Sequence, residues 1–138
     1  MDRRPIGVFD SGIGGLTVVK EIMEVLPDED IIYFGDTARV PYGSKSKETV
    51  IKFSFQCIRF LLEKGVKAIV IACNTASSAA LDVAQQSFDI PIVGVVEPGA
   101  VTACRVTRTN KIGIIGTEGT VSSGAYEKAI YRIDNSVN

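Results

Sequence analysis

The apolar run Ala68-Ile-Val-Ile-Ala72 constrains the fold of this chain more than any other stretch of its sequence. The run is short, unbroken and rich in β-branched residues, with Gly65 before it and the polar cluster Cys73-Asn74-Thr75 after it. Such a run is typical of a strand that is buried on both faces of a parallel sheet. The small residues from 76 to 81 then favour a helix. We therefore predict that Cys73 lies where a buried strand passes into a helix.

The rest of the sequence repeats this pattern of a strand followed by a helix. Further strands are predicted at residues 6–10, 30–36, 92–96 and 111–116, and further helices at residues 16–26, 46–64, 99–106 and from residue 121 onward. This alternation predicts parallel strands joined by right-handed crossovers. The expected fold class is α/β, built from βαβ units in a flavodoxin-like domain of three layers.

Polar residues follow the predicted strands. They are Asp10 and Ser11, Asp36 and Thr37, Cys73-Asn74-Thr75, Glu97, and Thr117. Because the carboxyl ends of parallel strands lie at one edge of the sheet, we expect these residues to share that edge, here called the carboxyl rim. Helix N-terminal N–H groups stabilise a thiolate, so Cys73 is a candidate reactive thiol. The alternative is that Cys73 is a small buried hydrophobic residue.

Two further motifs follow the first two strands. The turn Gly12-Ile-Gly14-Gly15 matches neither G-x-G-x-x-G nor the Gly-Lys-Ser/Thr of a P-loop, which excludes both nucleotide sites. We predict a tight turn whose backbone N–H groups face a small anion. Asp10 and Asp36 remain open as general bases, metal ligands or turn residues. No metal site is predicted, because no His and no Asp-x-Asp spacing accompanies them.

The composition excludes several classes of protein. A net charge of −1 gives no reason to expect nucleic acid or an anionic membrane as a partner. Three Cys without paired or metal-type spacing, and no His, indicate reduced thiols in the cytoplasm rather than a disulfide framework or a zinc site. No apolar run is long enough to span a bilayer. The lack of His also excludes a Cys-His-Asp/Asn hydrolase.

Several of these motifs, in the same order, closely resemble those of the glutamate racemases. The motifs are Gly7-Val-Phe-Asp-Ser-Gly-Ile-Gly-Gly-Leu-Thr-Val18, Tyr33-Phe-Gly-Asp-Thr-Ala-Arg-Val-Pro-Tyr-Gly43, Ala72-Cys-Asn-Thr-Ala76, Glu97-Pro-Gly99 and Gly116-Thr-Glu-Gly-Thr120. The resemblance implies an aspartate/glutamate racemase-type fold. It also implies an isomerase that needs no cofactor and converts L-glutamate to D-glutamate for peptidoglycan precursors.

The resemblance also implies roles for individual residues. Cys73 corresponds to one of two catalytic cysteines, the one that takes the α-proton from D-glutamate, and Asp10 assists this transfer. Substrate is expected at Asp10, Ser11, Pro41, Tyr42, Gly43, Asn74, Thr75, Thr117 and Thr120. Hydrogen-bond donors among these groups would stabilise the negative charge that develops when the α-proton leaves.

One departure from the family pattern concerns the second catalytic cysteine. The family places it in a Gly-Cys-Thr-His motif, which this sequence does not contain. We therefore interpret residues 1–96 as a first α/β domain and residues 97–138 as the incomplete beginning of a second. Because the second cysteine is missing, we expect this chain to be inactive as a racemase when alone. The alternatives are an aspartate or hydantoin racemase, or a small-anion binding fragment without turnover. The expected partners are L- and D-glutamate, with a homodimer as a further candidate.

Overall fold

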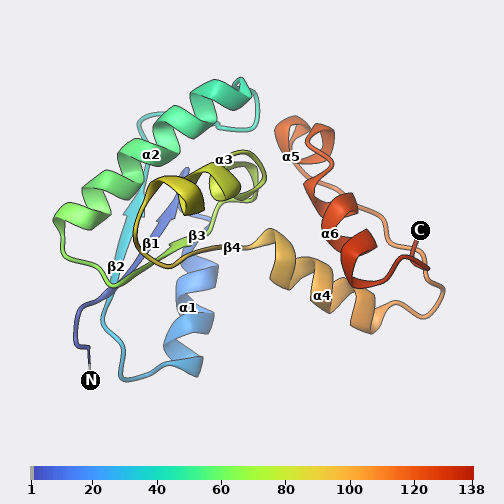
Figure 1. Ribbon diagram of the computed structural model, residues 1–138, viewed down its shortest axis with the longest axis horizontal. Coiled ribbons are helices and arrows are strands. Elements are labelled where there is room, and N and C mark those ends of the chain that lie inside the picture. Colours follow the sequence, from blue (N-terminus) through green and yellow to red (C-terminus); the bar gives the residue numbers. More distant parts are fainter. Residues whose placement is uncertain (1) are drawn as a thin grey trace.

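The computed structural model describes residues 2–138, and its sheet has four parallel strands in the order β2-β1-β3-β4 (Figure 1). The strands are β1 (Ile6–Asp10), β2 (Ile31–Gly35), β3 (Ala68–Ile71) and β4 (Ile92–Gly94). In the register of the central strand, Val8 of β1 lies between Tyr33 of β2 and Val70 of β3. Val8 and Phe9 are fully buried, as expected for an inner parallel strand.

Helices cover both faces of this sheet. Helix α1 (Leu16–Val25) lies on one face, and α2 (Lys47–Glu63) and α3 (Asn74–Ser87) lie on the other (Figure 1). Helix α2 begins where the Ser46 side chain accepts a hydrogen bond from the Thr49 N–H, and it buries Ile58 and Leu61 against the sheet. The predicted three-layer α/β arrangement is therefore confirmed.

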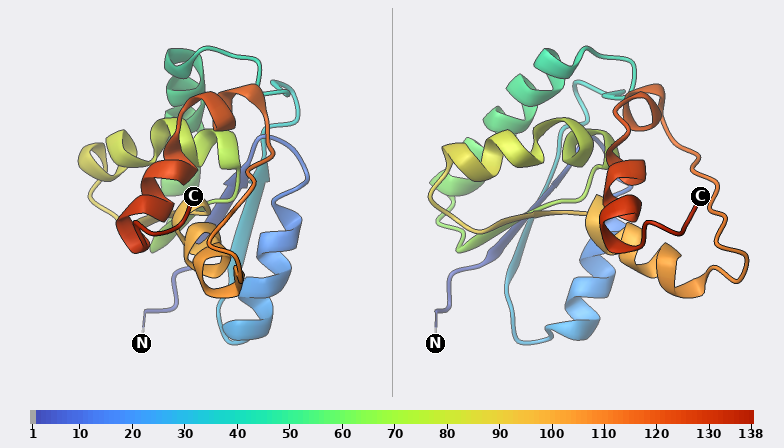
Figure 2. Two further views of the ribbon diagram at one scale, coloured as in Figure 1. Left: turned by 90° about the vertical axis from the view of Figure 1, so that its right-hand side faces the viewer. Right: turned by 45° about the vertical axis from the view of Figure 1, so that its right-hand side comes forward.

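Three more helices lie beyond β4. They are α4 (Val96–Val106), α5 (Glu118–Ser122) and α6 (Ala125–Ile133), and they lie at the side of the sheet rather than on its faces (Figures 1 and 2). Helices α4 and α6 bury an apolar cluster of their own, formed by Val96, Ala100, Ala129 and Ile130. The helical part of the chain therefore has a core that is separate from the core beneath the sheet.

The strand predicted at residues 111–116 is not formed. The segment has no regular secondary structure; Ile112 and Ile114 pack against the α4–α6 cluster, but Ile115 is 98% exposed. The Ile112 N–H donates to the Asn138 carbonyl oxygen over 2.8 Å. A strand requires a neighbouring strand to pair with. None of the described strands lies next to this segment, so the prediction was wrong.

Two helix boundaries also differ from the predictions. Strand β4 ends at Gly94, and α4 begins at Val96 rather than at Gly99, so the motif Glu97-Pro98-Gly99 lies within its first turn. Proline is tolerated there because the first-turn N–H groups have no partner within the helix. The last helix is split into α5 and α6 by Gly124, which has a φ of 64°.

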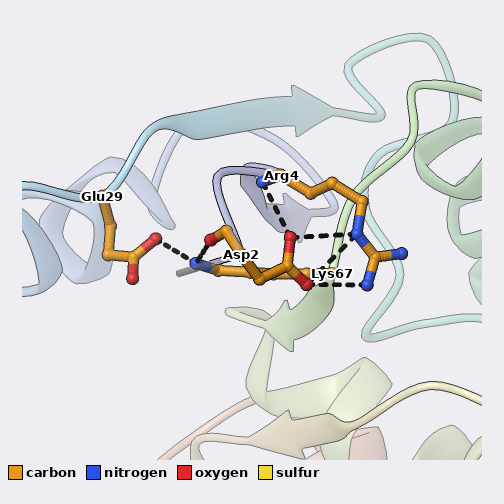
Figure 3. A network of polar contacts seen from close by, with 4 residues as sticks. All are labelled: Asp2, Arg4, Glu29 and Lys67. Carbon is orange, nitrogen blue, oxygen red and sulfur yellow. Dashed lines mark hydrogen bonds and ion pairs between the residues drawn. The ribbon is translucent and has the colours of Figure 1, made fainter.

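Ion pairs tie the chain together at the amino ends of the strands (Figure 3). Lys67, just before β3, donates to the Asp2 carbonyl oxygen over 2.8 Å and pairs with Glu29, just before β2. The Asp2 carboxylate in turn pairs with Arg4 over 2.7 Å. This network lies at the opposite end of the sheet from the carboxyl rim. It leaves that rim free for chemistry.

Candidate active site

The carboxyl ends of β1 and β3 border a cavity of about 470 Å³, here called the rim cavity. Its lining includes six of the predicted site residues: Asp10, Ser11, Cys73, Asn74, Thr75 and Thr117. A larger cavity of about 700 Å³ lies between α3, α5 and α6, but no thiol lines it. The predicted thiol and most of the polar side chains expected around it therefore share the smaller cavity.

Cys73 lies at the predicted junction, between the end of β3 and the first residue of α3. Its Sγ accepts a hydrogen bond from the Ala76 N–H over 3.4 Å, so the thiol caps the helix. The Sγ is also 3.6 Å from the Ser11 hydroxyl oxygen. A thiolate at this position can accept hydrogen bonds from both groups. The side chain is only 6% exposed, yet it borders the rim cavity.

The glycine turn after β1 holds the Asp10 carboxylate. Asp10 Oδ2 accepts from the N–H groups of Gly12, over 3.0 Å, and Gly15, over 3.2 Å. We predicted that the N–H groups of this turn face a small anion. For Gly12 and Gly15 the prediction was wrong, because their N–H groups donate to the Asp10 carboxylate instead. In the described part of the chain, no three His, Cys, Asp or Glu side chains gather as metal ligands.

Tyr33 of β2 supports the same turn, a role that sequence reasoning missed. Its hydroxyl donates to the Gly12 carbonyl oxygen over 2.8 Å. Burial, and then the charges of Asp10 and Cys73, raise the pKa of Tyr33, which keeps its hydroxyl protonated as a donor. The alternation of residue faces along β2 could have placed Tyr33 on the α1 side of the sheet. It could not have identified the carbonyl that Tyr33 contacts.

Three threonine hydroxyls join α3 to α5. Thr75 lies 2.8 Å from Thr117 and 3.4 Å from Thr120, and Thr117 lies 3.0 Å from Thr120. The Gly43 carbonyl accepts from the Gly119 N–H over 3.1 Å. A Cβ on Gly43 would lie 2.4 Å from the Thr117 Cβ, so only glycine allows this approach. Gly43, Thr75, Thr117 and Thr120 are therefore brought together, as one hydrogen-bonded group beside the rim cavity.

Tyr42, Asp36 and Cys57 form a separate buried group. The Tyr42 hydroxyl donates to Asp36 Oδ2 and lies 3.8 Å from the Cys57 Sγ, and Arg39 Nε pairs with the same carboxylate oxygen over 2.7 Å. Burial raises the pKa of Tyr42 and raises that of Cys57 to about 11. The sequence alone leaves Asp36 open as a general base, a metal ligand or a turn residue. Its contacts with Tyr42 and Arg39 support a structural role.

Pro41, Tyr42 and Gly43 do not line the rim cavity. Tyr42 is 1% exposed, and its hydroxyl is directed to Asp36 rather than to the rim cavity, where its expected contact with substrate would require it. The loop bears on the rim cavity through Gly43, which contacts Thr117 and Gly119. The substrate role of these three residues stays a prediction.

The surroundings of the cysteines lead to a prediction about their reactivity. In the folded chain, we expect iodoacetamide at near-neutral pH to alkylate Cys73 at least about tenfold faster than Cys57. The raised pKa keeps the buried Cys57 thiol protonated, whereas the Cys73 thiol borders the rim cavity, where the reagent can reach it. We also expect Cys73 to react before Cys104, which lies within α4 and packs against the α4–α6 cluster.

Peptide mapping by mass spectrometry measures the three rates, and the chain unfolded in denaturant is the control. Faster labelling of Cys57 or Cys104 in the folded chain would contradict the assignment.

Comparison with known proteins places these motifs in a family. Residues 6–137 match the family model described as Asp/Glu/Hydantoin racemase. The chain is 58% identical over 137 residues to a protein named glutamate racemase from Geobacter metallireducens, covering 99% of this chain and 51% of that protein. It is 50% identical over 137 residues to one from Lactococcus lactis, with the same two coverages. The chain thus spans about half the length of the curated relatives it matches.

Solved structures agree with the sequence comparisons. A glutamate racemase isoform from Bacillus anthracis superposes with a TM-score of 0.94 at 49% identity, covering 98% of this chain and 51% of that one. A glutamate racemase from Francisella tularensis, described as a complex with D-glutamate, gives a TM-score of 0.90 at 48% identity, covering 100% and 52%. No helix among residues 2–138 is both long and apolar enough to cross a membrane. With its sheet, its rim motifs and the family match over residues 6–137, this chain belongs to the Asp/Glu/hydantoin racemase family.

Proposed function

We propose that the rim cavity binds glutamate and that Cys73 exchanges the α-proton of D-glutamate, one half of a racemisation that needs no cofactor. The observation that carries this proposal is the position of the Cys73 thiol, between the Ala76 N–H and the Ser11 hydroxyl and beside a cavity lined with polar side chains. Support comes from the names of the relatives and from the D-glutamate in the Francisella tularensis structure.

The chemistry of the step is a proton transfer to sulfur. The Cys73 thiolate takes the α-hydrogen as a proton, so the Cα–H bond breaks, an S–H bond forms and the electron pair remains on the substrate. That charge spreads into the α-carboxylate and needs hydrogen-bond donors, which Ser11, Asn74 and Thr75 can supply at the rim. Asp10 lines the same cavity. We propose that it assists the proton transfer to Cys73.

Inversion requires more than this step. A proton returned by the same thiol restores D-glutamate, whereas L-glutamate forms only when an acid protonates the opposite face of Cα. Among the described residues, Cys73 is the one thiol that lines the rim cavity, since Cys57 is buried on the core side of α2 and Cys104 packs against the α4–α6 cluster. We infer that this chain alone supports exchange but not racemisation at a useful rate.

The wider role follows from the same proposal. D-Glutamate would be supplied for peptidoglycan precursors in the cytoplasm, a location that is supported by three free cysteines. Residues 97–138 would be the beginning of a second α/β domain, with the separate core of α4 and α6 as support. An aspartate or hydantoin substrate remains the alternative within the family.

Exchange in deuterated water tests this function. We expect the α-proton signal of D-glutamate to disappear faster than that of L-glutamate when each is incubated with the chain, without accumulation of the other enantiomer. Proton NMR follows the exchange, and chiral chromatography follows inversion. D-Aspartate is the comparison substrate. Exchange of neither glutamate enantiomer would refute the function of this chain, and steady racemisation would refute the inference about the missing acid.

A further inference from the structure

Tyr126 on α6 contacts a rim residue that lies 52 positions earlier in the chain. Its hydroxyl donates a hydrogen bond to Asn74 Oδ1. Asn74 is the first residue of α3, and it lines both the rim cavity and a neighbouring cavity of about 410 Å³ that Tyr126 also lines. The Asn74 side chain therefore stands in the wall between two cavities, with Tyr126 on the side away from the rim cavity.

The position of the Tyr126 ring is itself fixed. The ring lies against Gly99 of α4, where a Cβ would come within 3.2 Å of Tyr126 Cε1 and 3.3 Å of its hydroxyl oxygen. Ala129 and Ile130, on the following turn of α6, are buried in the cluster shared with α4. Burial also raises the pKa of Tyr126, so its hydroxyl keeps the proton that it donates. The packing of α4 and α6 thus determines where this donor lies.

In this contact the Asn74 amide presents its oxygen to the Tyr126 hydroxyl. A side-chain amide has an oxygen that only accepts and an NH₂ group that only donates. When Tyr126 holds the oxygen, the NH₂ group is left for the rim cavity. An amino acid with two carboxylates requires donors there, whereas a reversed amide would present its oxygen to an anion.

We propose that Tyr126 is a positioning residue for substrate binding, which holds the Asn74 amide by its oxygen so that the NH₂ group donates to a carboxylate of the bound amino acid. This proposal rests on the glutamate site proposed above. It gives the helical part of the chain a role in substrate binding, through one hydroxyl group that does not itself touch the substrate.

A double-mutant cycle on the 138-residue chain tests the proposal. Tyr126→Phe keeps the ring against Gly99 and removes only the hydroxyl. We expect it to raise the dissociation constant for D-glutamate about three- to tenfold, with the exchange rate at saturation changed less than about twofold. In an Asn74→Ala background, Tyr126→Phe should have no further effect. Tyr131→Phe, at a 67% exposed position on the same helix, is the matched control and should change neither quantity.

NMR of the Asn74 side-chain NH₂ group provides a readout without substrate. We expect its resonances to shift in Tyr126→Phe and not in Tyr131→Phe. Unshifted resonances in Tyr126→Phe overturn the proposal whether or not glutamate binds. Unchanged affinity, or an additional loss of affinity in the Asn74→Ala background, overturns it as well. A shifted resonance in a chain that binds no glutamate instead refutes the proposed function, and with it the carboxylate contact.

Discussion

Cys73→Ser is expected to lower the rate of α-proton exchange from D-glutamate by about 10²- to 10⁴-fold, the usual effect of removing a positioned general base. Serine preserves the shape of the side chain and can still cap α3, but its hydroxyl is a far weaker acid than a thiol and supplies almost no anion at neutral pH. The sequence contains no His that could act as a base for it. The measurement is the loss of the α-proton NMR signal in deuterated water at saturating D-glutamate.

Binding should respond much less than exchange to this substitution. Ser11, Asn74 and Thr75 remain in the lining, so the dissociation constant for D-glutamate is expected to change less than about threefold. Cys104→Ser is the matched control, because that thiol packs with the α4–α6 cluster and does not line the rim cavity. If the exchange rate of Cys73→Ser stays within about tenfold of that of the unsubstituted chain, the Cys73 thiol is not the base that takes the α-proton.

Gly35→Ala is expected to lower the free energy of unfolding by about 3 kcal/mol, at the upper end of the usual cost of overpacking. The Cβ would lie 2.3 Å from the carbonyl oxygen of Gly12, a backbone atom that cannot rotate away. Relief requires the turn after β1 to move, and that turn holds the Asp10 carboxylate through Gly12 and Gly15. We therefore expect exchange to be slowed as well as stability lowered. Denaturant unfolding followed by circular dichroism gives the change in stability.

Gly113→Ala is the matched glycine control. A Cβ there meets no atom within 4 Å, so its free energy of unfolding should change by less than about 1 kcal/mol. Comparable losses in the two variants would show that Gly35 matters only as a flexible residue. The close approach of β2 to the glycine turn would then not be needed for stability.

The sheet could be predicted because its strands are apolar runs bounded by turn residues, and these patterns are local. The run at residues 111–116 has the same local pattern and yet forms no strand. What it lacks is a neighbouring strand, and the hydrophobic period of a segment does not report whether a neighbour exists. The break at Gly124 was missed for a related reason, since the apolar spacing continues through a residue that leaves the helical conformation.

The site was predictable to the level of which residues gather, and less so for what each side chain contacts. Strand ends and family motifs indicated Cys73 and its neighbours at one rim, and the structure places them there. The use of the Gly12 and Gly15 N–H groups by Asp10, the burial of Tyr42 on Asp36 and the contact of Tyr126 with Asn74 depend on side-chain direction and on distant parts of the chain. A single sequence carries no direct signal for such contacts.

The threonine group that joins α3 to α5 is built from uncharged groups, as are the Gly43–Gly119 and Tyr126–Asn74 contacts beside it. Dissolved salt screens interactions between charges but acts only weakly on hydrogen bonds between neutral groups. The amino ends of β2 and β3 are held differently, by the ion pair of Lys67 with Glu29. Rising ionic strength should therefore loosen the amino ends of the strands, which lie away from the rim cavity. The contacts of the threonine group and of Asn74, which separates the rim cavity from its neighbour, should keep their geometry.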